Sequence, residues 1–160
     1  MAYDHVRVAI PTDANVIIGQ SHFIKTVEDL YEVMVTTVPQ ASFGLAFNEA
    51  SGPCLVRIEG NDADLQRAAA DTAMALAAGH VFVLFMRGAY PVNVLNRIKD
   101  CPEVCRVFCA TANPLEVIVA RSAQGSGVVG VIDGAPPTGV EQEADRQSRH
   151  AFLRTIGYKR

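Results

Sequence analysis

A run of six apolar residues at 81–86, Val-Phe-Val-Leu-Phe-Met, constrains the fold of this chain more than any other part of the sequence. A strand without alternating polar residues fits the centre of a sheet that is covered on both faces. The run is far shorter than the roughly 18 apolar residues that a membrane span needs. The sequence therefore predicts a buried central strand, with helices or other strands on both sides of its sheet.

The rest of the sequence alternates between helical and strand patterns. Apolar residues recur with a 3.6-residue period over 27–38, and Pro91 is well placed to begin a short helix that ends near Lys99. Asn61 or Asp62 caps an alanine-rich helix that ends near Gly79, and a last helix begins near Glu141. The expected strands are 5–10, 15–20, 42–48, 54–59, 81–86, 103–110, 115–121 and 127–132. The predicted class is α/β or α+β, with one mixed β-sheet flanked by about four helices.

Length and composition limit the organisation of the chain. Its 160 residues fit a single domain, 1–160, and the net charge of -3 gives no general attraction to nucleic acid. Hydrophobic residues make up 49% and charged residues 19%, which predicts burial of some surface in a homo-oligomer. The first residues carry no basic and apolar pattern of a signal peptide. We therefore expect a cytoplasmic protein without a membrane partner.

Two apparent motifs fail in their context. Residues 125–130 match the glycine pattern of dinucleotide sites, but Pro136 and Pro137 forbid the helix that must follow it. The spacing of Cys101, Cys105 and Cys109 suggests a metal site, yet 104–109 has strand composition, so we interpret the thiols as buried structural groups. The four histidines show no ligand spacing, and no Gly-Lys pair forms a phosphate loop. The sequence gives no evidence of a metal or dinucleotide cofactor.

Polar residues gather where the predicted strands end. Each of them alone fits a cap or a turn, but together they indicate a site for a small polar ligand, because ligands of open α/β sheets bind at strand ends. A phosphate would need a positive or dipolar cradle, which Lys25 and the helix N-terminus near Thr26 could supply. The candidate binding residues are Ser21, Lys25, Asn48, Glu49, Asn61, Tyr90, Asn93, Thr111, Asn113 and Asp133.

His22 is the candidate catalytic residue. It lies between a predicted strand and a helix N-terminus, and a neutral imidazole is a nucleophile towards phosphorus or a general base. The alternative is a turn histidine beside a helix that Thr26 caps. His80 precedes the buried strand, where packing at a helix–strand joint is the expected role, and Glu49 and Asp133 are the available acid–base partners.

Nine sequence blocks, spread from about residue 4 to the end, resemble the adenosine-specific kinase family. The resemblance implies an α/β fold, an oligomer with a trimer as one candidate, recognition of adenosine and AMP in preference to ADP and ATP, and a histidine that carries a phosphoryl group. We place that role on His22, while Asn48 stands where the family pattern has cysteine. The blocks are 15–30, 49–52, 60–62, 79–82, 90–96, 102–105, 108–114, 127–134 and 152–160.

Three functions follow as alternatives. The first is a phosphotransferase, an adenosine-specific kinase whose phosphoryl donor the sequence does not identify. The second is a sensor or store that binds adenosine or AMP and catalyses nothing, which the missing phosphate loop favours. The third is a structural oligomer with polar strand ends. If the chain binds a purine, we expect Tyr90 to stack on it, since it lies at a strand-to-helix turn.

Overall fold

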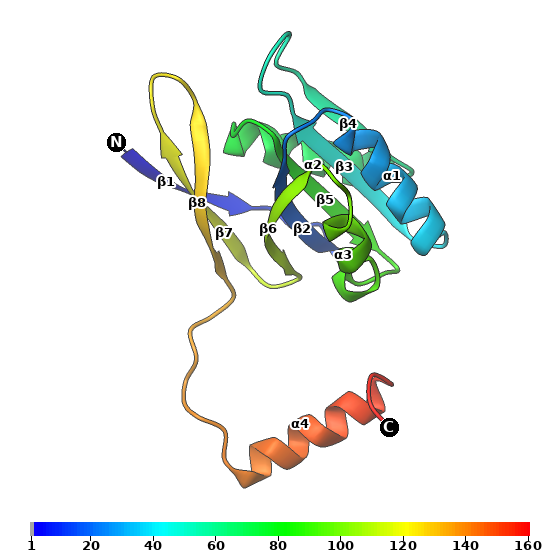
Figure 1. The fold of residues 1–160 in the computed structure, drawn as a ribbon. Coiled ribbons are helices and arrows are strands. Elements are labelled where there is room, and N and C mark those ends of the chain that lie inside the picture. The colour runs from blue at the N-terminus through cyan, green and yellow to red at the C-terminus, as the bar shows by residue number, and fades with distance from the viewer. Residues whose placement is uncertain (1) are drawn as a thin grey trace.

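Strand β5 (Val81–Arg87) lies at the centre of a five-stranded sheet, as its unbroken apolar sequence predicts. The computed structural model describes residues 2–160 (Figure 1). Every pair of neighbouring strands in this sheet is antiparallel. The other four strands, in sheet order β4-β3-β5-β2-β6, are β4 (Val56–Gly60), β3 (Ser42–Asn48), β2 (Asn15–Ser21) and β6 (Val104–Thr111).

A second sheet holds β1 (Ala2–Val8), β7 (Leu115–Arg121) and β8 (Ser126–Asp133), again antiparallel. The predicted class of strands combined with helices is confirmed. The strands differ from the expectation in one respect: they divide between two antiparallel sheets and do not share one mixed sheet. Short connections such as 122–125 between β7 and β8 explain the antiparallel pairing, because strands joined by tight turns pair antiparallel.

Three helices cover the five-stranded sheet. Helices α1 (Thr26–Thr37) and α3 (Pro91–Lys99) bury Leu30, Met34 and Val94 against one face. On the other face, α2 (Ala63–Leu76) shares a core with the second sheet. Its alanine-rich side permits close approach: a Cβ added to Gly44 of β3 would lie 2.1 Å from the backbone nitrogen of Gln66. The side chain of Asp62 caps α2 as predicted, accepting from the N–H of Asp64 and of Leu65.

The fourth helix, α4 (Glu143–Thr155), forms near the predicted position but does not flank the sheet. None of its residues is buried, and Figure 1 shows it apart from the other elements at the end of an extended segment. Among the described residues, no helix has the length and apolar character needed to cross a bilayer.

Candidate functional site

The antiparallel order divides the predicted site residues between two opposite ends of the sheet. Ser21 pairs with Val104 at one end, and Val16 pairs with Thr111 at the other. Along β2, the seven steps from Asn15 to His22 correspond to about 24 Å of extended chain. At the His22 end lie Ser21, His22, Lys25, Asn48 and Glu49, and at the other end lie Asn61, Tyr90, Asn93, Thr111, Asn113 and Asp133. One small ligand therefore cannot contact both groups within a single chain.

His22 lines a cavity of about 260 Å³ at its end of the sheet. We call this cavity the histidine pocket. It brings together two imidazoles, from His22 and His80, and the carboxylate of Glu49. The full lining is His22, Phe23, Ile24, Phe47, Glu49, Ala50, Ser51 and His80. A neighbouring cavity of about 540 Å³ shares Glu49 and Ala50 with it.

Backbone hydrogen bonds fix the backbone at both histidines. The N–H of His22 donates to the carbonyl of Glu103 at 3.0 Å, and the N–H of Ser21 donates to the carbonyl of His80 at 3.0 Å. His80 has a φ of 62°, and its N–H donates to the carbonyl of Asn48 at 2.7 Å. Its ring stacks on Phe47 at a centroid distance of 5.8 Å. The backbone of the two histidines is therefore held at the ends of four adjacent strands, β3, β5, β2 and β6.

The segment between His22 and α1 carries unpaired amides. Thr26 does not cap the helix as predicted: it is the first helical residue, fully buried, and its hydroxyl donates to Ser21 Oγ at 2.6 Å. Its own N–H donates to the carbonyl of Phe23. Within residues 2–160, the N–H groups of Phe23, Ile24 and Lys25 donate to no protein acceptor. Three consecutive free donors beside an imidazole form a site suited to an anion.

Glu49 faces the pocket as an ionised carboxylate. Its Oε1 accepts from Arg57 Nη2 at 2.8 Å, and its Oε2 accepts from the N–H of Leu55 at 2.8 Å. The Arg57 guanidinium, together with that N–H, holds the pKa of Glu49 below its ordinary value. The carboxyl group therefore remains negative at neutral pH and keeps a fixed orientation.

Asn48 has a structural role in this arrangement. Its Nδ2 donates to the carbonyls of Ala73 and Ala78, at 2.9 and 3.0 Å, at the end of α2. Ala77 between them adopts a left-handed conformation with a φ of 50°. The side chain thus closes the helix end and is absent from the lining of the histidine pocket.

Lys25 is also occupied by protein groups. Its Nζ bonds to Asp29 Oδ2 and lies 3.5 Å from Glu103 Oε2. The hydrogen bond to Asp29 raises the pKa of Lys25. Glu103 is almost fully buried, and burial raises the pKa of its carboxyl group. Lys25 therefore does not form the expected phosphate site. Its charge is balanced by two acids, and it lies outside the pocket lining.

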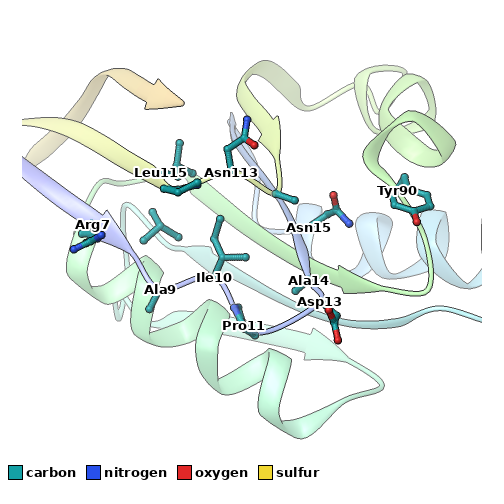
Figure 2. Close-up of a pocket in the computed structure, with 13 residues that line it drawn as sticks. Arg7, Ala9, Ile10, Pro11, Asp13, Ala14, Asn15, Tyr90, Asn113 and Leu115 are labelled. Carbon is teal, nitrogen blue, oxygen red and sulfur yellow. The ribbon is translucent and has the colours of Figure 1, made fainter. Parts of the chain in front are cut away.

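A larger cavity of about 680 Å³ lies at the opposite end, between the two sheets and α3 (Figure 2). We call it the tyrosine pocket, because Tyr90, 60% exposed, borders it. Asn15 and Asn113 contribute amides, and Arg7 and Asp13 contribute charges of opposite sign. Its lining holds no histidine or cysteine, so it offers a binding surface but no nucleophile of the kind that His22 provides.

The polar side chains of the other predicted residues at this end are bonded to protein groups. Asn61 accepts from the N–H of Phe43 and donates to the carbonyl of Ala41. Asn93 accepts from the N–H of Tyr90 at the start of α3. Asp133 Oδ1 accepts from the hydroxyl of Thr111 at 2.8 Å and from Asn113 Nδ2 at 3.1 Å. The Asn93 bond caps α3, whereas the bonds of Asn61 and Asp133 join segments that are distant in the sequence.

Sequence reasoning did not place His80 in one pocket with His22, and it missed the buried carboxyl group of Glu103. The signal for His80 lies in the sheet order, since the start of β5 adjoins the end of β2 once these strands pair antiparallel. The cysteines also differ from the prediction. Cys109 is buried, but Cys105 and Cys54 are exposed, because β6 is an edge strand with an irregular register and Cys54 lies in a hairpin loop.

Comparisons with known proteins agree with the resemblance in the sequence. The family model described as adenosine specific kinase matches residues 6–159. The crystal structure of the PH1918 protein from Pyrococcus horikoshii OT3 is 42% identical and superposes with a TM-score of 0.95, covering 99% of this chain and 98% of that one. None of the curated proteins searched matches the chain.

Proposed function

Because the chain belongs to the adenosine-specific kinase family, we propose that it binds adenosine and AMP in the histidine pocket and transfers a phosphoryl group through His22. The observation that carries this proposal is the sequence of groups at 22–25: an exposed imidazole followed by three free backbone N–H donors. An anion held by those donors would lie beside the nucleophile. Phosphoryl transfer depends mainly on such positioning and charge stabilisation.

The transfer takes two displacements. In the first, a ring nitrogen of His22 attacks the phosphorus of a phosphoanhydride or phosphate-ester donor, the bond from phosphorus to the leaving oxygen breaks, and that oxygen keeps the electron pair. In the second, the 5′ oxygen of adenosine attacks the same phosphorus. The phosphorus–nitrogen bond breaks, its electrons return to the imidazole, and the hydroxyl proton passes to a base. His80 lines the same pocket and is our candidate for that base.

The other features of the proposal follow from the same family assignment. We infer a preference for adenosine and AMP over ADP and ATP, since the pocket of about 260 Å³ is small and the chain has no phosphate loop. We further propose that residues 1–160 act as one unit within a cytoplasmic homo-oligomer. The phosphoryl donor is a separate substrate of the first displacement.

A sensor or store that binds AMP without catalysis is the second candidate. One observation favours it: the part of the histidine pocket that this chain supplies contains no lysine or arginine. Charge on a transferring phosphoryl group is usually stabilised by such cations or by a metal ion. Binding of AMP alone makes a weaker demand, which the amides at 23–25 can meet.

Intact-mass measurement after incubation with phosphate donors tests the phosphoryl carrier. We expect one phosphoryl adduct that is labile in acid and stable in base, as a phosphorus–nitrogen bond is. His22→Gln keeps a hydrogen-bonding side chain, removes the nucleophile and should lose the adduct. His80→Gln is the matched control and should keep it. An adduct that persists in His22→Gln, or that survives acid, would place the chemistry on another residue.

Calorimetric titration tests the ligand preference. Adenosine and AMP should bind the wild-type chain more tightly than ATP, and His22→Gln should keep adenosine binding. Equal or tighter binding of ATP would contradict the proposed pocket. If neither adenosine nor AMP binds or raises the melting temperature, the proposed function fails, and the structural oligomer becomes the better account.

A further inference from the structure

Residues 135–160, here called the arm, make no hydrogen bond or ion pair to the rest of the described chain. The arm leaves the second sheet after Gly134, whose N–H donates to the carbonyl of Pro114, and runs through an extended segment into α4 (Figure 1). Its hydrogen bonds and ion pairs join arm residues only, such as Arg149 with Glu141. Only Leu153 is half-buried, and every other arm residue is exposed.

A helix like α4 is unstable when it stands alone. With 13 residues it is about the length at which isolated helices are only marginally formed in water. Large apolar side chains lie in its last turn and directly after it, with Phe152 59%, Ile156 44% and Tyr158 51% exposed. Apolar residues grouped in this way mark a surface that is covered by a partner.

The arm has the same placement relative to the rest of the chain as in the crystal structure described above. The arm is 26 of 160 residues, so a displaced arm would limit the TM-score to 134/160, or about 0.84. The observed TM-score of 0.95 requires most of the arm to superpose. An arm that makes no hydrogen bond or ion pair to the rest of the described chain needs contacts from outside the chain to keep this place.

Charge complementarity indicates what that partner is. The arm contains five of the 14 Lys and Arg residues and three of the 17 Asp and Glu residues, for a net charge of +2. Residues 1–134 therefore carry a net charge of -5. The arm of one copy and residues 1–134 of another attract each other, and Arg154, Lys159 and Arg160 place the basic charge next to the apolar side chains.

One groove on the surface of residues 2–134 complements the arm in apolar character and in charge. It lies between α1 and the edge strand β4, with a volume of about 620 Å³. Ile24 and Ile58 are 40% and 49% exposed there. In the described chain, Lys25 and Arg57 of this groove form ion pairs with acids. Glu28 and Glu59 of the groove form no ion pair there. The groove thus offers apolar side chains beside two free carboxylates.

We propose that the arm of each chain lies across a second copy of this chain, with the apolar side of α4 in the groove between α1 and β4. The arm is long, since eight extended residues span about 27 Å and the helix adds about 20 Å. Ile24 lines both this groove and the histidine pocket. The seated arm therefore ends beside the histidine pocket of its partner.

The arm then supplies what the histidine pocket lacks. Arg154, Lys159 and Arg160 of one copy bring cations to a pocket whose own lining has none. They meet the phosphate of a bound nucleotide and leave the nucleoside untouched. This second part rests on the proposed function, while the seating of the arm does not, and the two parts are tested by separate measurements.

Disulfide trapping between two full-length variants tests the seating of the arm. One carries Ile58→Cys and the other Ile156→Cys, and both carry Cys54→Ser and Cys105→Ser to remove exposed thiols. After mixing and oxidation, we expect a species of twice 17.2 kDa that neither variant forms alone. Val129→Cys on β8 replaces Ile58→Cys as one control, and Gln147→Cys on the opposite side of α4 replaces Ile156→Cys as the other.

The outcomes separate clearly. A cross-link that forms equally with Val129→Cys, or no cross-link in the mixture, overturns the proposed seat. Sedimentation gives the second readout. Phe152→Asp should reduce the mass towards that of one chain, while Gln147→Asp, with the same added charge, should not. Because no arm residue belongs to the core of residues 2–134, Phe152→Asp should keep the wild-type far-UV circular dichroism.

AMP binding tests the contribution to the pocket. In the combined variant Arg154→Gln, Lys159→Gln and Arg160→Gln, AMP affinity should fall by about tenfold or more, since charged contacts to phosphate are lost. Adenosine affinity should stay within about twofold. Equal losses for both ligands, or none, would show that the arm does not reach the phosphate. If wild-type protein binds no AMP while the cross-link forms, the proposed function fails and the seating stands.

Discussion

Replacing Asn48 with alanine separates the two roles that the sequence and the structure give to this residue. From the sequence it was a candidate ligand contact. In the structure its Nδ2 donates to the carbonyls of Ala73 and Ala78, and the side chain is buried. Asn48→Ala removes both bonds and leaves two carbonyl oxygens at the end of α2 without this donor.

The expected loss of stability follows from these two bonds. Each intramolecular hydrogen bond contributes about 1–1.5 kcal/mol net, and both carbonyls keep one backbone donor, the N–H of Ala77 and that of Val81. We therefore expect the free energy of unfolding to fall by about 2–3 kcal/mol. For a chain of this size, that corresponds to a decrease of about 4–12 °C in melting temperature.

Urea unfolding and calorimetric titration of AMP measure the two roles on the same samples. Asn96→Ala is the matched control, because Asn96 is exposed on α3, and its free energy of unfolding should change by about 0.5 kcal/mol or less. For Asn48→Ala, calorimetric titration should give an AMP affinity close to that of the wild type. A stability loss below about 0.5 kcal/mol together with a large loss of AMP affinity would refute the structural role.

Four further predictions follow from particular contacts. Tyr90→Ala should change adenosine affinity by no more than about twofold, because Tyr90 lies at the opposite end of the sheet from His22; a large loss by calorimetry would restore the stacking role expected from the sequence. Gly44→Ala should lower the free energy of unfolding by about 1–3 kcal/mol or more, since its Cβ would lie 2.1 Å from the backbone nitrogen of Gln66; an unchanged urea midpoint would contradict this packing. Because Arg57 lowers the pKa of Glu49, the ionised form stabilises the fold above the ordinary value of 4.5, and this contribution is lost as pH falls. Urea midpoints between about pH 3 and 6 should therefore depend less on pH in Glu49→Gln than in the wild type. Burial raises the pKa of the Cys109 thiol to about 11, so alkylation near neutral pH should modify Cys54 and Cys105 first and reach Cys109 only after unfolding; the modified positions are identified by mass spectrometry.

Local patterns predicted most of the secondary structure. The six apolar residues of β5, the proline that begins α3 and the cap at Asp62 each act over a few residues, so their outcomes are visible in the sequence. The division into two antiparallel sheets was not predicted, because strand partners depend on contacts between distant segments. The same limit affects Cys105, whose exposure depends on β6 being an edge strand.

The candidate site was predictable only in part for the same reason. The position of His22 after a strand and before a helix was correct, and so was the expectation of backbone amides beside it. The donors, however, are at 23–25, since Thr26 is buried and bonds to Ser21. Grouping every polar strand end into one site assumed that the strand ends meet, whereas antiparallel order places Asp133 and Glu49 at opposite ends. His80 became a candidate only after β5 was placed beside β2.

A phosphate chase tests the central claim, that His22 passes a phosphoryl group to adenosine. Protein carrying isotope-labelled phosphate is separated from the donor and mixed with adenosine, and label on the protein and in AMP is followed over time. The account predicts that label leaves His22 and appears in AMP in equal amount and at the same rate, while His22→Gln carries no label to transfer. Label that remains on the protein while adenosine is bound would contradict the kinase and support a protein that only binds its nucleotide.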